Sequence, residues 1–256
     1  MRILSFFLAI CLVACSKPSP NRLVIGTIAG PETDLVEVAK DLAQSKYGLS
    51  LKIIEFNDYN LPNEALEDGS LDANVYQHLP YLEAATKAHG YHLQAIGKTF
   101  IYPTGIYSNK IKNLTELKAQ ALIAIPNDPS NEARALLLLQ KAKLIQLKQV
   151  AMPTLADILS NPKQLRFKEL DAAQLPRVLA DVDAAVINTN FAVPAGLSVK
   201  DAIFSEGKDS PYANLIVIRS DSTKKPQLEN FVKAMNSAEV KAKAKQLFGD
   251  EAIPAW

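Results

Sequence analysis

Short apolar runs alternate with amphipathic stretches along most of this chain, and this alternation restricts its fold more than any other feature. Residues 23–27 have the composition of a buried strand, and the apolar positions from Leu35 to Ala43 then fall on one face of a helix that Gly48 ends. Strands that alternate with helices in this way are typical of βαβ units in a parallel sheet. We therefore predict an α/β protein.

The pattern runs through two cycles, which predicts two α/β lobes. The remaining strands of the first cycle are expected at 51–56 and 73–76, and its helices at 63–67 and 79–88. The second cycle follows a β-rich run at 100–107, with strands at 122–125, 165–170 and 184–187 and a helix at 130–142. A strand at 215–218 and helices at 227–235 and 239–248 complete the chain. Periodicity does not indicate which lobe contains the segment after Ser210.

The first fifteen residues have a different composition. Arg2 precedes an apolar run at 3–14, which is typical of a signal peptide and too short for a bilayer span of about 20 residues. The run ends in Leu-Val-Ala-Cys, which resembles a bacterial lipobox. We therefore predict a lipoprotein signal peptide at 1–15, lipidation of Cys15 and a polar tether at 16–21; a plain secretory signal is the alternative. The only other cysteine is Cys11, so we expect no disulfide in the domain.

Charge and motif spacing argue against nucleic-acid binding and catalysis. The 28 Lys and Arg residues balance 27 Asp and Glu residues, so the chain as a whole does not attract a polyanion. Gly90 separates His89 from His92 and breaks the helix that would align them as metal ligands. Asp181 and Asp183 flank Val182 just before an apolar strand and are expected to cap or solvate the turn. We predict a protein that is not an enzyme, with no metal and no cofactor.

A group of aromatic, amide and guanidinium side chains lies beside predicted strand ends, where open α/β sheets usually bind ligands. An arginine grips a carboxylate through parallel hydrogen bonds, amides serve either end of a zwitterion, and aromatic rings favour a thioether. Taken alone, Arg134 would be an ordinary solvated charge on a helix. The group is Tyr59, Tyr76, His78, Tyr81, Tyr102, Tyr107, Asn127, Asn131, Arg134, Asn188 and Asn214.

These residues lie in longer segments that closely resemble the methionine-binding lipoproteins of the methionine ABC importer, over nearly the whole mature chain. The resemblance rests on several motifs in the same order. They are Phe-Asn-Asp-Tyr at 56–59, Gln-His-Leu-Pro-Tyr-Leu at 77–82, Pro-Asn-Asp-Pro-Ser-Asn at 126–131, Gln-Leu-Pro-Arg at 174–177, Ala-Val-Ile-Asn-Thr at 185–189 and Ser-Pro-Tyr-Ala-Asn-Leu at 210–215.

The resemblance implies a periplasmic-binding-protein fold, in which two α/β lobes are joined by crossing strands and the ligand is buried in the cleft between them. It places 22–103 and 211–256 in lobe 1 and 104–210 in lobe 2. The thioether pocket would consist of Tyr59, Tyr76, His78 and Tyr81. Arg134, Asn188 and Asn214 would hold the carboxylate and the ammonium. The family often has phenylalanine where this chain has Tyr76, which adds a hydroxyl that needs a partner.

The implied function is the capture of L-methionine or a related small amino acid by a monomer. The protein would be anchored through Cys15 in the bacterial cell envelope, facing the periplasm, and would deliver its ligand to the permease and ATPase of an ABC importer. Another amino acid or a methionine-containing dipeptide remains an alternative ligand. A surface lipoprotein for adhesion is an alternative of a different class, and a periplasmic hydrolase is the last.

Overall fold

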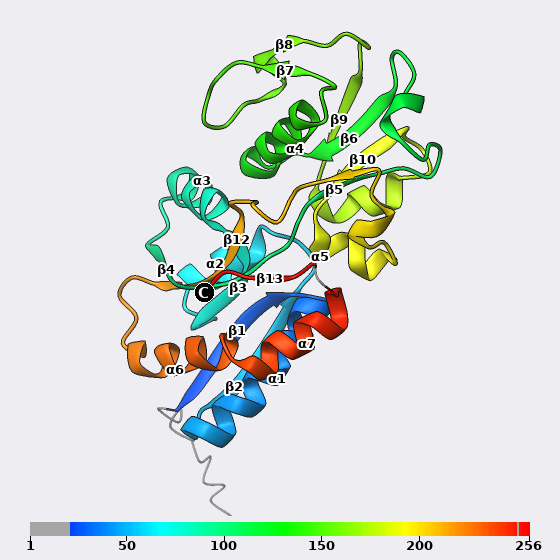
Figure 1. Cartoon of the computed structure of the whole chain (residues 1–256). Coiled ribbons are helices and arrows are strands. Elements are labelled where there is room, and N and C mark those ends of the chain that lie inside the picture. The colour runs from blue at the N-terminus through cyan, green and yellow to red at the C-terminus, as the bar shows by residue number, and fades with distance from the viewer. Residues whose placement is uncertain (1–20, 250) are drawn as a thin grey trace, which may run out of the picture.

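The computed structural model describes residues 21–249 and 251–256, and its two main β-sheets lie in separate parts of the molecule (Figure 1). Cys11, Cys15 and the predicted signal peptide lie outside the described residues. The first sheet has the order β13-β4-β12-β3-β1-β2. Its strands are β1 (Arg22–Ile28), β2 (Ser50–Phe56), β3 (Ala73–His78), β4 (Leu93–Ile101), β12 (Ala213–Arg219) and β13 (Ile253–Pro254).

The second sheet has the order β11-β5-β10-β6-β9. Its strands are β5 (Gly105–Tyr107), β6 (Leu122–Pro126), β9 (Arg166–Leu170), β10 (Ala184–Ile187) and β11 (Phe204–Ser205). A small pair, β7 (Gln146–Leu147) and β8 (Ile158–Ser160), lies beyond it. The chain passes from the first sheet to the second between β4 and β5, and returns between β11 and β12.

The predicted α/β class is confirmed, but the sheets are mixed rather than purely parallel. Strand β1 is parallel to β2 and β3, whereas β12 runs antiparallel to both β3 and β4. In the second sheet β6 is parallel to β9 and β10, and β5 is antiparallel to β10. Strands β5 and β12, the first strand after each crossing, run antiparallel to their neighbours, and so does the C-terminal strand β13 to β4.

The expected β-rich run at 100–107 was wrong in its boundaries. Strand β4 already begins at Leu93, and the ladder stops at Ile101 before β5 begins at Gly105. Pro103 has no N–H to donate and restricts the residue before it, so the strand cannot continue through this point. This break is where the chain crosses between the sheets.

Helix α1 (Pro31–Tyr47) shows how local sequence defines an element. Pro31 occupies the first turn, which suits its fixed φ and its missing N–H. The helix ends at Gly48 (φ 62°), a left-handed position that glycine adopts without a steric penalty. The other helices are α2 (Leu61–Glu67), α3 (Leu79–His89), α4 (Pro129–Lys141), α5 (Thr189–Ala192), α6 (Lys225–Met235) and α7 (Ala238–Phe248).

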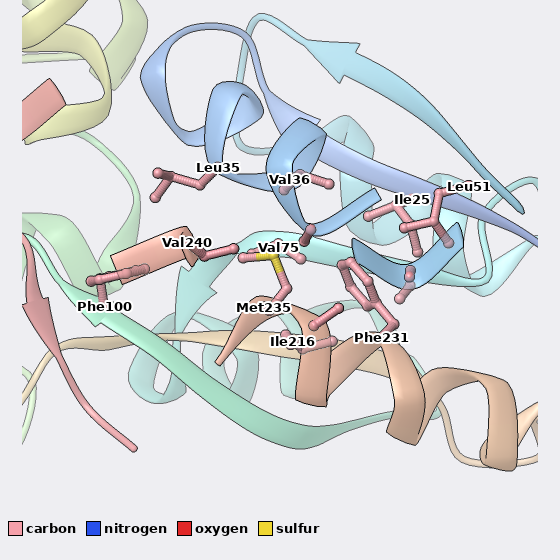
Figure 2. Packing of buried hydrophobic residues seen from close by; sticks show 14 of the residues in the cluster. Ile25, Leu35, Val36, Leu51, Val75, Phe100, Ile216, Phe231, Met235 and Val240 are labelled. Carbon is pink, nitrogen blue, oxygen red and sulfur yellow. The ribbon is translucent and has the colours of Figure 1, made fainter. Parts of the chain in front are cut away.

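Helices α1, α6 and α7 cover one face of the first sheet and form its main core. Val36, Phe231 and Met235 from the helices pack against Val75 and Ile216 from the strands (Figure 2). Burial of each such side chain contributes roughly 1.5–3 kcal/mol. Since residues 21–256 contain no cysteine, this packing holds the fold together without disulfides.

Candidate functional site

A cavity between the two sheets collects side chains from both parts of the molecule. It contains about 340 Å³ free of protein atoms, including the part that opens to solvent. All seven residues expected at the ligand lie in its wall: Tyr59, Tyr76, His78, Tyr81, Arg134, Asn188 and Asn214. They form one group in space, and their contact with a ligand stays a prediction.

Five more residues complete the wall: Gln77, Tyr102, Asn131, Thr189 and Asn190. Tyr102 and Asn131 belong to the wider set of sequence candidates. Tyr107 and Asn127, also of that set, are not part of the cavity wall. Tyr107 is buried in a core cluster of the second sheet, and Asn127 is exposed.

Strand ends and helix starts place these side chains. Strand β3 is buried along its whole length and ends at His78, and Asn188 directly follows β10. His78 caps α3, since its Nδ1 accepts a hydrogen bond from the backbone N–H of Tyr81 at 3.3 Å. Helix α4 begins beside β6 and contributes Asn131 and Arg134. The carboxyl ends of the strands thus face the cavity, as expected for an open α/β sheet.

Three tyrosines, Tyr59, Tyr76 and Tyr81, form what we call the tyrosine wall. Their ring centroids lie 5.8–5.9 Å apart. The hydroxyls of Tyr76 and Tyr81 both donate to the backbone carbonyl of Tyr59, at 3.0 and 2.7 Å. Phe191 extends the wall from the second part of the chain, with its ring 4.8 Å from that of Tyr59. Because these two hydroxyls are satisfied internally, the wall offers ring surface to an apolar tail.

His78 is neutral and belongs to a chain of hydrogen bonds. Burial and the nearby charge of Arg134 lower its pKa from 6.5 to about 3. Since Nδ1 accepts from Tyr81, the proton lies on Nε2, which faces Asn131 Oδ1 at 3.4 Å. Asn131 Oδ1 also accepts from Asn188 Nδ2 at 2.8 Å. These bonds fix the Asn188 amide with its oxygen directed away from Asn131.

Arg134 is buried rather than solvated, so its interpretation as an ordinary surface charge was wrong. Only 4% of the residue is exposed, because its guanidinium forms two parallel bonds with Glu206, from Nε at 2.7 Å and from Nη2 at 2.5 Å. Nη2 also donates to the carbonyl of Tyr102 at 3.0 Å, and the guanidinium lies 4.2 Å from the ring of Tyr212. Among the described residues nothing accepts from Nη1, which leaves two donors for a ligand.

Two polar atoms in the cavity wall are buried without a hydrogen-bond partner in the described part of the chain. They are the Oδ1 of Asn188 and the hydroxyl of Tyr102. An unsatisfied buried polar group costs roughly 1–3 kcal/mol. A ligand with polar groups at these positions would remove that penalty.

A buried carboxylate, Glu32, lies behind the cavity wall. Its two oxygens accept from Asn214 Nδ2 at 3.0 Å and from Asn190 Nδ2 at 2.8 Å. Burial raises its pKa from 4.5 to about 7, although both amide bonds act in the opposite direction. The site therefore combines a fixed cation, a shielded carboxylate, amide oxygens and an aromatic wall, an arrangement that suits a zwitterion with an apolar tail.

The sequence analysis missed several residues that build this site. Glu32 and Glu206 resemble ordinary surface acids, and their partners lie 72 to 182 positions away in the chain. Asn190 lies two positions after Asn188, which was a sequence candidate, and this proximity was the one signal that could have identified it. Gln77 is fixed by a buried amide network with Asn63 and Asn74, which no local pattern indicates.

The motifs considered for catalysis or metal binding lie elsewhere. His92 is exposed and bonds Glu67 through Nδ1 at 2.9 Å, and Asp183 accepts from the N–H of Leu122 at 2.7 Å. Over residues 21–249 and 251–256, no three His, Cys, Asp or Glu side chains are grouped as a metal site would require. Within the same residues, every helix is too short or too polar to cross a bilayer.

Residues 23–256 match the NlpA lipoprotein family. The chain is 48% identical to a D-methionine-binding lipoprotein MetQ from Salmonella typhi, over 97% of this chain and 94% of the relative. The same name belongs to a relative from Escherichia coli that is 47% identical over equal shares of the two chains.

Solved structures agree with the fold. An ABC transporter periplasmic substrate-binding protein from Coxiella burnetii is 59% identical, with a TM-score of 0.89 over 91% of this chain and 100% of that one. A nutrient binding protein from Burkholderia cenocepacia bound to methionine is 50% identical, with a TM-score of 0.89 and the same coverage. This likeness confirms the predicted periplasmic-binding-protein fold.

Proposed function

The chain belongs to the NlpA lipoprotein family, and from that premise we propose that it is a substrate-binding lipoprotein that captures methionine and delivers it to an ABC importer. The observation that carries the proposal is the cavity between the sheets, with one cation, unpaired amide oxygens and a tyrosine wall. Relatives of similar length are named for methionine binding, and one solved neighbour contains methionine. The role is binding rather than catalysis.

Each part of the cavity matches one part of the amino acid. The free donors of Arg134 hold the α-carboxylate, and the Oδ1 atoms of Asn188 and Asn214 accept from the α-ammonium. The thioether lies against Tyr59, Tyr76 and Tyr81, with neutral His78 beside them. Contacts between sulfur and an aromatic ring contribute on the order of 0.3–1.5 kcal/mol each.

The proposed lobes are residues 22–103 with 211–256 and residues 104–210, joined at the two crossings between the sheets. Ligand binding closes them by a hinge motion and presents a docking surface to the permease, while the ATPase subunit supplies the energy. The hinge lies where Thr104 and Glu206 bond each other, with the N–H of Glu206 donating to the carbonyl of Thr104 at 3.0 Å. The carboxylate that holds Arg134 is thus part of the hinge.

The membrane anchor is the lipid on Cys15, after removal of the signal peptide and with 16–21 as the tether to a domain that faces the periplasm. We expect wild-type cells to incorporate labelled palmitate into the protein and a Cys15→Ala variant to incorporate none. Label retained by the variant would contradict the anchor and leave a plain secretory signal as the explanation.

Removal of the Tyr76 hydroxyl is expected to have little effect on binding. Its partner is the Tyr59 carbonyl, which keeps the bond from Tyr81 in a Tyr76→Phe variant. The lost neutral bond corresponds to roughly 0.5–1.5 kcal/mol of folding stability. We expect methionine affinity within about threefold of wild type by calorimetry, with a small decrease in Tm. A collapse of affinity would show that the hydroxyl contacts the ligand.

The function is tested by native mass spectrometry and thermal unfolding of the purified protein. We expect a bound mass equal to that of methionine, and a rise in Tm when D- or L-methionine is added to protein stripped of ligand, because a ligand that binds only the folded state stabilises it. A dipeptide mass, or stabilisation by another amino acid alone, would correct the ligand. If no solute stabilises the fold, the transport function is wrong and a surface role such as adhesion replaces it.

A further inference from the structure

We propose that Glu32 is a positioning residue that directs the amide oxygens of Asn190 and Asn214 at the ligand's ammonium, and that this arrangement assembles only when the two lobes close. The inference rests on the proposed function and extends it, because it assigns ammonium selection to a carboxylate that does not line the cavity. Glu32 would then link recognition of one ligand group to closure.

Glu32 lies in the first turn of α1 and is 4% exposed. It does not form an ion pair with a lysine or arginine in the described part of the chain; its partners are the two amides alone. A buried carboxylate without a cation is unfavourable unless strong hydrogen bonds surround it. Its position therefore calls for a role beyond packing.

The orientation of both amides follows from the carboxylate. An ionised carboxylate only accepts hydrogen bonds, so each amide must present its NH₂ group to it. The oxygens of Asn190 and Asn214 then point away from Glu32, and no group in residues 21–249 or 251–256 donates to them. With the unpaired Oδ1 of Asn188, the wall presents three amide oxygens, which attract an ammonium.

The two amides come from different sides of the cleft. Asn214 is in β12 of the first sheet, whereas Asn190 is in α5, which follows β10 of the second sheet. Gly30, directly before α1, has φ 128° and lies so near Pro194 that a Cβ would come within 2.9 Å of its ring. The start of α1 therefore packs closely on the second side, and opening of the cleft would separate Glu32 from Asn190.

Glu32 titrates among several other titratable and charged groups. Burial raises its pKa to about 7. In the cavity wall on the same side of the cleft, the pKa of His78 is lowered to about 3. Burial raises the pKa values of Tyr59 and Tyr102 well above 10, and the charge of Glu32 adds to this effect. The Arg134 guanidinium lies in the opposite wall, and Asp128, whose pKa is also raised by burial, accepts from the amide of Asn131. When Glu32 is protonated, it donates one hydrogen bond itself. One of the two amides must then rotate so that its oxygen accepts this bond, and its NH₂ group faces the ammonium.

The test compares the wild type with Glu32→Gln, an isosteric mimic of the protonated acid, using L-methionine and the same molecule without its amino group, 4-(methylthio)butanoate. Glu132→Gln is the matched control, because Glu132 is also a buried acid near a helix start but lies outside the cavity and accepts from the N–H of Leu155 at 3.0 Å. We expect Glu32→Gln to weaken methionine binding roughly 10- to 100-fold, with little change for the des-amino compound. Glu132→Gln is expected to change neither.

The dependence of methionine affinity on pH distinguishes a positioning role of Glu32 from a purely structural role. Wild-type affinity for methionine should fall as the pH is lowered from about 7.5 to 5.5, and that of Glu32→Gln should stay nearly flat. If Glu32→Gln fails to fold, Glu32→Asp, which keeps the charge on a shorter side chain, replaces it and should show weaker methionine binding. The role of Glu32 would be overturned if a folded Glu32 variant bound methionine as tightly as the wild type and preferred it over 4-(methylthio)butanoate to the same degree. Failure of the wild type itself to bind methionine would instead overturn the proposed function, and this inference with it.

Discussion

Replacement of Arg134 with alanine is expected to weaken methionine binding by at least about 100-fold. The guanidinium is the cation in the cavity wall, and each charge-assisted hydrogen bond to a carboxylate is worth roughly 1.5–3 kcal/mol when shielded from water. Loss of two such bonds therefore corresponds to two or more decades in affinity. Calorimetric titration of the stripped protein measures this loss directly.

The same substitution is expected to reduce the stability of the fold. Arg134 neutralises Glu206, whose side chain is 10% exposed, and an unpaired buried charge costs roughly 3–5 kcal/mol. The double variant Arg134→Ala with Glu206→Gln separates the two effects, because it should recover stability without recovering affinity. Recovery of both, or wild-type affinity in the single variant, would show that Arg134 supports the hinge and does not contact the ligand.

Replacement of Asn214 with alanine is expected to weaken methionine binding roughly 10- to 100-fold, because it removes one acceptor for the ammonium and one donor to Glu32. Since the bond from Asn214 lowers the pKa of Glu32, its loss should raise that pKa further above 7. Calorimetry at two pH values reports both effects. Circular dichroism checks that the fold is intact.

Asn127→Ala is the matched control for this substitution. Asn127 belongs to the wider set of sequence candidates beside strand ends, but it is exposed and lies outside the cavity. Its variant should keep wild-type affinity. Equal losses in the two variants would contradict the specific role of Asn214.

The titration of Glu32 also makes the stability of the fold depend on pH. Its folded pKa of about 7 lies above the ordinary 4.5, so the native state without ligand binds the proton more tightly than the unfolded state. The resulting stabilisation is fully present below about pH 4.5 and is lost as the pH rises towards 7, where the ionised form is disfavoured by a few kcal/mol. An ionised Glu32 therefore lowers the stability of the fold at neutral pH. This is consistent with a binding role, because residues that serve function often reduce local stability.

The order of strands and helices could be predicted from sequence because most elements have a continuous apolar run or a clear amphipathic face. Strand β4 was missed at its start because it is only partly buried and contains Gly97 and Lys98 within a mixed pattern. Gly97 is required where β4 meets α6, since a Cβ there would come within 2.9 Å of Val232. That contact is tertiary, so no local pattern predicts it.

The candidate site was predictable in its aromatic and amide members, largely through the resemblance to a known family. The carboxylates that orient these members were not, because Glu32 and Glu206 have the composition of surface acids and acquire their role only when distant segments meet. The burial of Arg134 has the same origin: the helix pattern places it on a polar edge, and Glu206 from the crossing segment covers that edge. Sequence patterns identified the groups that line the cavity better than the groups that hold them in place.

The most direct test of this account is a crystal structure of the protein with methionine bound. We predict one methionine in the cavity, with its carboxylate on Arg134, its ammonium within hydrogen-bond distance of the Oδ1 atoms of Asn188 and Asn214, and its sulfur against Tyr59, Tyr76 and Tyr81. Methionine bound outside this cavity, or with its ammonium directed at the tyrosine wall, would contradict the account.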